Sequence, residues 1–117
     1  MNKSAIKKAY KQAKQPMGVY RIGNTRNDKV FIGFATNLQA RFNRHHAELS
    51  FGSHENRELQ EIWNSYGESA IEFEILDELK TEENTSTDNR EELRLLAEMW
   101  VQKLEKAGDS VILLKHG

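Results

Sequence analysis

Two short apolar segments joined by a polar turn constrain the fold of this chain more than any other feature. Residues 17–23 and 29–35 are rich in β-branched and aromatic side chains, and the connection 23–28 contains Gly, Asn and Asp. This pattern predicts a β-hairpin. Gly18 and Gly33 each fall at one end of a predicted strand, where glycine marks either a close approach of backbone or ligand, or simply a strand end.

Hydrophobic periodicity predicts the elements that follow the hairpin. Two helices, a strand of alternating polarity, a polar loop and a long helix come in that order. Residues 111–114 fit either a short last strand or an apolar tail on the core. This mixed order predicts an α+β fold in which a small, mainly antiparallel three-stranded sheet is flanked by helices. The predicted bounds are 37–49 (capped by Thr36 or Asn37), about 54–66 (capped by Ser53 and ended by Gly67), 70–76, 80–89, and 89–107 (capped by Asp88 and ended by Gly108).

The chain of 117 residues has the length of one domain, which we expect to span 17–117. The spacing of apolar and basic residues in 1–16 predicts a basic amphipathic helical extension that ends at Pro16 and includes Lys7 and Lys11. The extension fits either a solvated helix or an arm that lies along DNA phosphates.

Charge is distributed unevenly along the chain. Residues 1–46 hold ten Lys or Arg and one acidic residue, whereas 47–117 hold seven Lys or Arg and seventeen acidic residues. A basic half of this density can follow a phosphate backbone, with Arg26, Lys29 and Arg44 as candidate contacts beside the basic extension. The other interpretation is that the two halves attract each other within the fold.

Composition excludes several classes of site. The absence of cysteine excludes disulfides and thiolate zinc sites. No apolar run reaches the roughly 20 residues of a membrane span, and no apolar segment follows the basic N-terminus as a secretory signal requires. These features fit a cytoplasmic protein that does not bind membranes.

Several residues could support hydrolysis of a phosphodiester, which needs a base, a phosphate-binding cation and stabilisation of the leaving oxygen. Arg41 and His45 lie four residues apart and share a helix face. Glu98 stands within an apolar run, where a carboxylate is usually paired, bound to metal or at the rim of a site. From the residues alone, His45 or His46 also fits an inner helix face, and Tyr20 fits a packed strand aromatic.

The ordered set of motifs resembles the GIY-YIG nuclease family over about residues 17–108. Residues 18–20 (Gly-Val-Tyr) and 31–33 (Phe-Ile-Gly) are similar to its two signature tripeptides. Residues 41–45 resemble its Arg-x-x-x-His helix segment, and 52–54 resemble a further histidine segment of phage intron homing endonucleases, the group with the most similar nuclease domains. Glu98 falls at the position of the metal-binding glutamate of the family.

The resemblance implies a metal-dependent endonuclease that cuts DNA and uses one Mg²⁺ or Mn²⁺ ion, with no small-molecule cofactor. It implies that Tyr20 positions or deprotonates the attacking water, that Arg41 holds the phosphate, and that His45 binds phosphate or relays a proton. His54 would be an accessory contact, and Glu98 would hold the metal. Members often carry a separate targeting domain, and a protein partner is one possible source of targeting for this chain.

Two departures from the family pattern predict an attenuated enzyme. Phe31 stands where the second tripeptide has tyrosine, and a phenyl ring cannot donate, accept or transfer a proton. The C-terminal segment 109–117 also contains no asparagine, which the family usually places there. Two alternatives therefore remain: a domain of this fold that binds nucleic acid and cuts weakly or not at all, and a small protein-interaction module.

Overall fold

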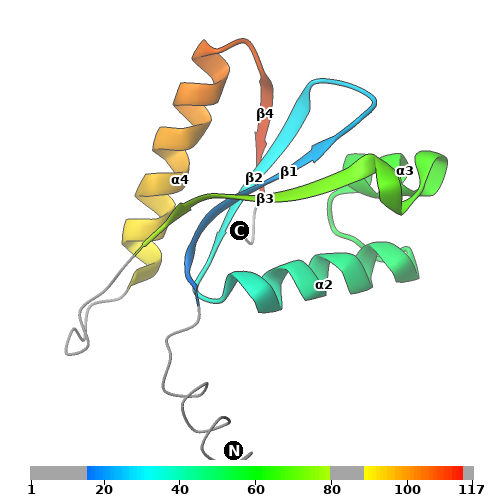
Figure 1. Cartoon of the computed structure of the whole chain (residues 1–117), viewed down its shortest axis with the longest axis horizontal. Helices are drawn as coiled ribbons and strands as arrows, with labels where there is room; N and C mark the ends of the chain where they lie inside the picture. Colours follow the sequence, from blue (N-terminus) through cyan, green and yellow to red (C-terminus); the bar gives the residue numbers. More distant parts are fainter. Residues whose placement is uncertain (1–15, 80–88, 115–117) are drawn as a thin grey trace, which may run out of the picture.

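The computed structural model describes residues 16–79 and 89–114, which form a four-stranded sheet with helices on both faces (Figure 1). Three segments lie outside the described residues: 1–15 of the predicted helical extension with Lys7 and Lys11, 80–88 of the predicted loop with Asp88, and 115–117. In chain order the elements are β1 (Gly18–Asn24), β2 (Lys29–Ala35), α2 (Leu38–Phe51), α3 (Arg57–Tyr66), the short 3₁₀ helix η1 (Glu68–Ala70), β3 (Ile71–Glu78), α4 (Asn89–Lys106) and β4 (Ser110–Leu113).

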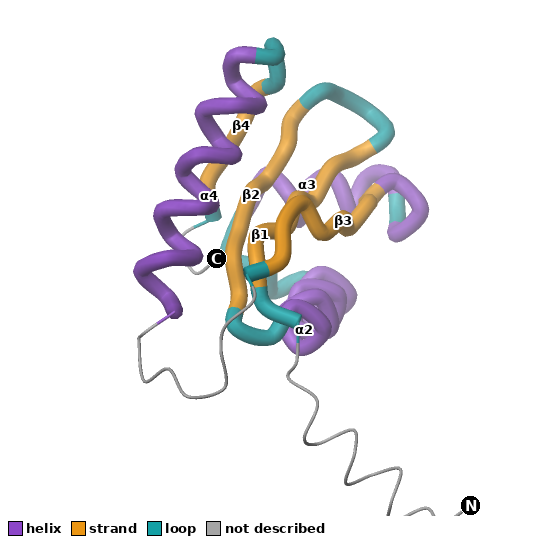
Figure 2. The backbone as a smooth tube through the Cα atoms, turned by 60° about the vertical axis from the view of Figure 1, so that its left-hand side comes forward, coloured by secondary structure: helices purple, strands orange, loops and turns teal. Residues whose placement is uncertain are grey.

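The sheet is mainly antiparallel, and its strand order is β3-β1-β2-β4. β1 pairs antiparallel with both β2 and β3, while β4 runs parallel to β2 (Figure 2). The α+β class is confirmed. The sheet has one strand more than the three predicted, because Ser110–Leu113 pairs with Lys29–Ile32 along the open edge of β2. This pairing selects the strand over the apolar tail, the two interpretations that the sequence left open.

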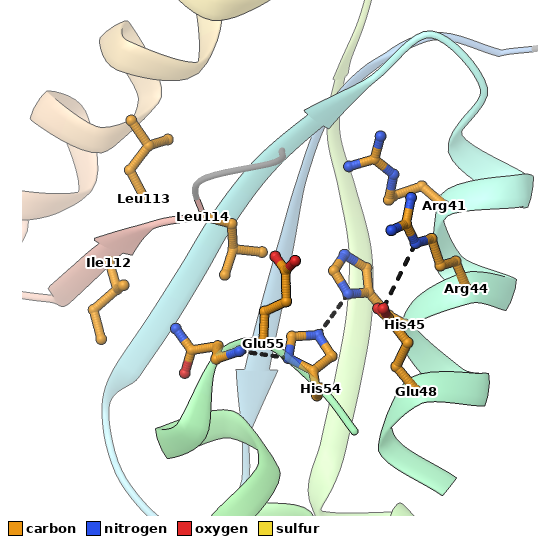
Figure 3. Close-up of a pocket in the computed structure, with 10 residues that line it drawn as sticks. Arg41, Arg44, His45, Glu48, His54, Glu55, Ile112, Leu113 and Leu114 are labelled. Atoms are coloured by element: carbon orange, nitrogen blue, oxygen red, sulfur yellow. Dashed lines mark hydrogen bonds and ion pairs between the residues drawn. The ribbon is translucent and has the colours of Figure 1, made fainter. Parts of the chain in front are cut away.

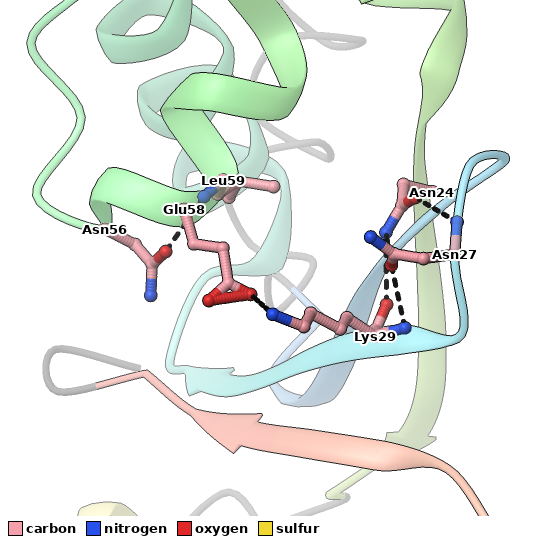
Figure 4. Close-up of polar contacts among 6 residues, drawn as sticks. All are labelled: Asn24, Asn27, Lys29, Asn56, Glu58 and Leu59. Atoms are coloured by element: carbon pink, nitrogen blue, oxygen red, sulfur yellow. Dashed lines mark hydrogen bonds and ion pairs between the residues drawn. The ribbon is translucent and has the colours of Figure 1, made fainter.

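The hairpin turn is held by two asparagine side chains (Figure 4). Oδ1 of Asn24 accepts hydrogen bonds from the backbone N–H groups of Arg26 and Asn27, both 2.9 Å long. Oδ1 of Asn27 accepts from the amide of Lys29, also at 2.9 Å. These short-range bonds replace the ladder bonds that the turn cannot make, which is why Asn-rich segments favour such connections.

Alternation along the strands separates two apolar clusters, one on each face of the sheet. Tyr20, Ile22 and Phe31 lie on the face that α2 and α3 cover, whereas Val19 and Ile32 lie on the face that α4 covers. Figure 1 shows α4 on one side of the strands and α2 and α3 on the other. A side chain on α4 is therefore separated by the sheet from one on α2.

The helix caps confirm one predicted boundary and correct another. Asn37, one of the two predicted candidates, caps α2, since its side chain accepts a hydrogen bond from the amide of Ala40 at 3.0 Å. The prediction that Ser53 caps the next helix was wrong: Asn56 does so, by accepting from the amide of Leu59 at 2.9 Å. Ser53 belongs to the end of α2, because its amide donates to the Glu48 carbonyl behind Gly52, which has φ of 77°.

The remaining bounds differ from prediction by one or two residues. The third strand begins and ends slightly later than 70–76, because η1 occupies residues 68–70. Helix α4 covers 89–106, and Gly108 follows it with φ of 100°. Among the helices of residues 16–79 and 89–114, none combines the length and the apolar character needed to cross a membrane.

Candidate active site

The signature glycines are required by close approaches within the sheet. Gly33 pairs with Tyr20 across the hairpin, and a Cβ atom at Gly33 would lie 2.4 Å from the Tyr20 hydroxyl oxygen. A Cβ atom at Gly18 would lie 1.9 Å from the carbonyl oxygen of Asp77 on β3. The register of β1 and β3 shifts between Val19 and Tyr20, directly beside this contact. The close-approach interpretation of both glycines is therefore confirmed.

Replacing Gly33 with alanine is expected to destabilise the domain by about 1–3 kcal/mol, because the new methyl group overlaps the Tyr20 ring in a close-packed core. Urea unfolding of the wild type and the variant measures this difference. The matched control is a double-mutant cycle with Tyr20→Ala, in which removal of the ring should abolish the cost of the added methyl. An equal cost in both backgrounds would contradict the steric explanation.

Phe31 lies two ladder positions away from this contact, on the same face of the sheet, and is completely buried. It pairs with Ile22 and belongs to the same apolar cluster as Tyr20. The phenyl ring therefore contributes to the core, but it offers no hydroxyl to the site. A site built on these two strands has a single phenol, that of Tyr20.

Tyr20, His45 and His54 form a continuous chain of hydrogen bonds. The Tyr20 hydroxyl lies 2.6 Å from Nε2 of His45, and Nδ1 of His45 lies 2.8 Å from Nε2 of His54. His45 comes from the inner face of α2 and is only 7% exposed. His46, the sequence alternative for the inner face, is exposed and contacts Glu68 instead. Both ring nitrogens of His45 are occupied, so neither is free to bind a phosphate oxygen.

Burial controls the protonation of this chain. It raises the pKa of Tyr20 to about 12, although the nearby Arg41 partly opposes the shift through its charge and a hydrogen bond. Burial lowers the pKa of His45 to about 3, and the charges of His54 and Arg41 act in the same direction. The pKa of His54 is lowered as well, chiefly by burial. At neutral pH, Tyr20 is thus a phenol and both histidines are neutral.

A cavity of about 420 Å³ opens beside the histidine pair (Figure 3). Helix α2 contributes two arginines, one histidine and one glutamate, the loop before α3 contributes three polar residues, and residues 112–114 at the end of β4 form the apolar side. Tyr20 does not line the cavity and reaches it only through His45 and Arg41. The lining residues are Arg41, Arg44, His45, Glu48, His54, Glu55, Asn56, Ile112, Leu113 and Leu114.

Gln60 fixes the loop that carries His54, and periodicity did not single it out. Its Oε1 accepts from the amide of His54 at 3.0 Å, and its Nε2 donates to the carbonyl of Leu49 at 3.0 Å. Only 8% of Gln60 is exposed. The sequence distinguishes Gln60 only as an uncharged polar residue next to Leu59 in an amphipathic helix. This pattern predicts a side chain at the edge of the buried face, and it does not predict a link between α2 and the loop that carries His54.

The candidate nucleic-acid contacts are distributed over different parts of the described structure. Arg44 lines the cavity and pairs with Glu48 at 3.7 Å. Lys29 instead pairs with Glu58 on α3 (Figure 4), and Arg26 lies over the ring of Tyr66 at 4.4 Å. Contacts between the basic and acidic halves, such as Lys29 with Glu58, agree with the interpretation that the halves attract each other. Arg44 is the candidate contact that shares a surface with Arg41.

Comparison with known proteins decides the family. The GIY-YIG catalytic domain matches residues 16–98. The chain belongs to the GIY-YIG family. It is 37% identical over 67 residues to intron-associated endonuclease 1 of enterobacteria phage T4, a stretch that covers 57% of this chain and 27% of that protein. The chain therefore matches only about a quarter of the length of this curated relative.

Two solved structures of the I-TevI catalytic domain share this GIY-YIG fold. The domain of this homing endonuclease superposes with a TM-score of 0.64 at 29% identity, and the match covers 82% of this chain and 97% of that domain. A point mutant of the same domain gives the same TM-score and identity, with coverage of 81% and 90%. The resemblance to phage intron homing endonucleases is thus confirmed, as is the fold that it implies.

Glu98, the glutamate expected to bind metal, lies apart from the other GIY-YIG site residues. Its Oε1 accepts a hydrogen bond of 2.6 Å from Arg94 on the same helix, and 43% of its side chain is exposed. The adjacent Ala97 is buried on the face of the sheet opposite Tyr20. Glu98 is also absent from the residues that line the cavity. Its metal role stays a prediction, and the structure does not bring it to Arg41 and His45.

His45, Glu48 and His54 form a group whose ligand atoms lie within 4.8 Å of one another, a spacing that could hold a metal ion. The three members differ in fit. The nitrogens of both imidazoles already take part in hydrogen bonds, and Mg²⁺ prefers oxygen ligands. The carboxylate of Glu48 fits such an ion without disrupting the histidine chain. It faces the same cavity as Arg41.

Proposed function

We propose that this GIY-YIG domain is a divalent-metal-dependent endonuclease that hydrolyses DNA phosphodiester bonds, with a rate attenuated by Phe31. One observation carries the proposal: His45 and His54 line one cavity together with Arg41 and Arg44, and His45 connects this cavity to the Tyr20 hydroxyl. Together they supply groups for proton transfer and for binding an anionic phosphate.

The arginines account for substrate binding in this proposal. A guanidinium group matches a phosphate with two parallel hydrogen bonds, and it stabilises the charge that develops during displacement. Arg41 also approaches Tyr20, because its charge lowers the pKa of that phenol against the effect of burial. Arg41 therefore links the phosphate position to the proton-transfer group, whereas Arg44 adds charge at the cavity wall.

The proposed ion is a single Mg²⁺ or Mn²⁺. When bound, it would polarise the phosphate and stabilise the leaving oxygen. Mg²⁺ is commonly held by one or two carboxylates together with waters and substrate phosphate, so Glu48 at the cavity wall is sufficient as a protein ligand. This placement favours Glu48 over Glu98, since Glu98 pairs with Arg94 on the other side of the sheet.

A plasmid-nicking assay tests the function and the metal ligand together. We expect nicking in Mg²⁺ or Mn²⁺, no nicking in EDTA, a loss of about 10-fold or more in Glu48→Gln, and less than a threefold change in Glu98→Gln. Both substitutions remove one charge from a carboxylate that pairs with an arginine, so they are matched. Absence of nicking by the wild type on duplex, branched and single-stranded DNA would contradict the function. A larger loss of nicking in Glu98→Gln than in Glu48→Gln would instead support Glu98 as the metal ligand.

A second candidate function is a GIY-YIG domain that binds nucleic acid without cutting it. The lack of a hydroxyl at Phe31 and the distance of Glu98 from the cavity residues favour this candidate. It predicts affinity for DNA that falls steeply with salt, as expected when lysines and arginines displace counterions from phosphates. Binding with no cleavage in the assay above would select it. Recognition of a particular DNA site would in either case come from a further segment or a protein partner.

A further inference from the structure

The hydrogen bonds that connect His54, His45 and Tyr20 have a single direction, because a backbone amide fixes one end. The N–H group of Asn56 donates to Nδ1 of His54 at 3.0 Å. A backbone N–H group cannot accept a hydrogen bond, so Nδ1 of His54 carries no proton. A neutral His54 then carries its proton on Nε2, and this group donates to Nδ1 of His45 at 2.8 Å.

The same reasoning applies to His45. Because its Nδ1 accepts from His54, its own proton lies on Nε2, and this group donates to the Tyr20 oxygen at 2.6 Å. The argument requires both imidazoles to be neutral, and burial lowers the pKa of each of them. The direction thus runs from the Asn56 amide through two rings to the phenol.

We propose that His54 is a positioning residue that makes His45 a hydrogen-bond donor to Tyr20, so that His45 cannot accept the Tyr20 proton. This proposal deepens the proposed nuclease function and rests on it. In this arrangement the Tyr20 oxygen receives a hydrogen bond from His45 in the phenol state and in the phenolate state. The donor would stabilise the negative charge of a phenolate.

The surroundings of His54 hold it in the orientation that the proposal needs. Its backbone amide donates to Gln60, and Gln60 in turn donates to the Leu49 carbonyl on α2 and to Oδ1 of Asn64 on α3. Asn56, whose amide sets the direction, also caps α3. Two helices therefore fix the backbone of His54 and the residue whose amide donates to its ring. Figure 3 shows the rings of His45 and His54 next to each other at the cavity.

Nitrogen NMR of the full chain labelled with ¹⁵N-histidine reads the tautomers directly. Near pH 7.5 we expect His45 and His54 each to show a protonated Nε2 and an unprotonated Nδ1, with signals assigned by single His→Gln substitutions. A protonated Nδ1 on His45 in the wild type would overturn the proposal. This measurement does not depend on cleavage, so a wild type that fails to cut DNA contradicts the nuclease function and leaves the tautomer result standing.

Two substitutions at His54 separate positioning from packing. In His54→Gln the side-chain NH₂ group can donate to His45 while the carbonyl accepts from Asn56, so we expect the His45 tautomer to persist and cleavage to fall clearly less than in His54→Leu. In His54→Leu we expect the Nε2-protonated form to lose its dominance and cleavage to fall about 10- to 100-fold, as for other residues that orient a functional histidine. Equal losses in both variants would contradict the proposal. If the leucine variant does not fold, the tautomers of the wild type and the glutamine variant still decide the question.

Discussion

Substitution of Arg41 by alanine is expected to lower the rate of DNA nicking by about 10²- to 10³-fold, the usual effect of removing one donor from a developing anion. Arg41 lines the cavity and also forms a hydrogen bond with the Tyr20 side chain. Arg41→Lys keeps the charge but loses the planar fork that binds phosphate with two hydrogen bonds, so its rate should lie between those of alanine and the wild type. Single-turnover cleavage at saturating protein measures the chemical step.

Arg44→Ala is the matched control for this prediction. Arg44 lines the same cavity, but it is more exposed and pairs with Glu48, so its removal should cost less than tenfold. If both arginines contact phosphate, each variant should also reduce the slope of log affinity for DNA against log salt concentration by about one. A rate for Arg41→Ala within threefold of the wild type would refute a direct role of Arg41 in the reaction.

Local patterns predicted most of the fold because they act over a few residues. The hairpin, the Asn37 cap and the helix bounds near Gly67 and Gly108 depend on turn chemistry and periodicity. The Ser53 cap failed because Gly52 adopts a left-handed conformation that continues the end of α2 by one residue. The last strand stayed ambiguous because a four-residue apolar run has the same pattern whether it pairs with β2 or packs on the core.

The candidate site could be predicted only in part, because its contacts join distant segments. Periodicity allowed either His45 or His46 on the inner face, and only the packed helix selects His45. The motif resemblance contributed His54 without its partners. Gln60 holds the backbone of His54 and the Asn56 amide holds its ring, but nothing in the sequence pattern of either residue indicates these contacts.

Glu98 illustrates the opposite limitation. An acidic residue in an apolar run predicts a carboxylate that is paired, bound to metal or at the rim of a site. A helix that contains such a run still has a solvent-facing side, however. The i,i+4 pair with Arg94 places Glu98 on that side. Sequence therefore identified the residue types of a nuclease site more reliably than the set of residues that meet in space.

Substitution of Tyr20 by phenylalanine is expected to lower the nicking rate by about 10²- to 10⁴-fold, the range of general acid–base contributions. The phenyl ring can still pack beside Phe31, but His45 loses the acceptor for its Nε2 proton and the site loses its phenol. The wild-type rate should also rise with pH between about 6 and 9, since burial raises the pKa of Tyr20 to about 12 and the phenolate fraction below this value grows about tenfold per pH unit. His45, with its pKa lowered to about 3, adds no ionisation in this range.

Phe31→Tyr is the matched control for Tyr20→Phe, because it adds one hydroxyl at the neighbouring, fully buried position. If the second phenol of the family is what limits this domain, the rate should rise by up to about 10²-fold, while an unsatisfied buried hydroxyl would cost about 1–3 kcal/mol of stability. Thermal unfolding and the rate–pH profile should be measured on both variants. A wild-type rate that levels off near pH 7, or a Tyr20→Phe rate equal to that of the wild type, would exclude the Tyr20 phenolate as the base. The hydroxyl would then serve to hold His45 in place.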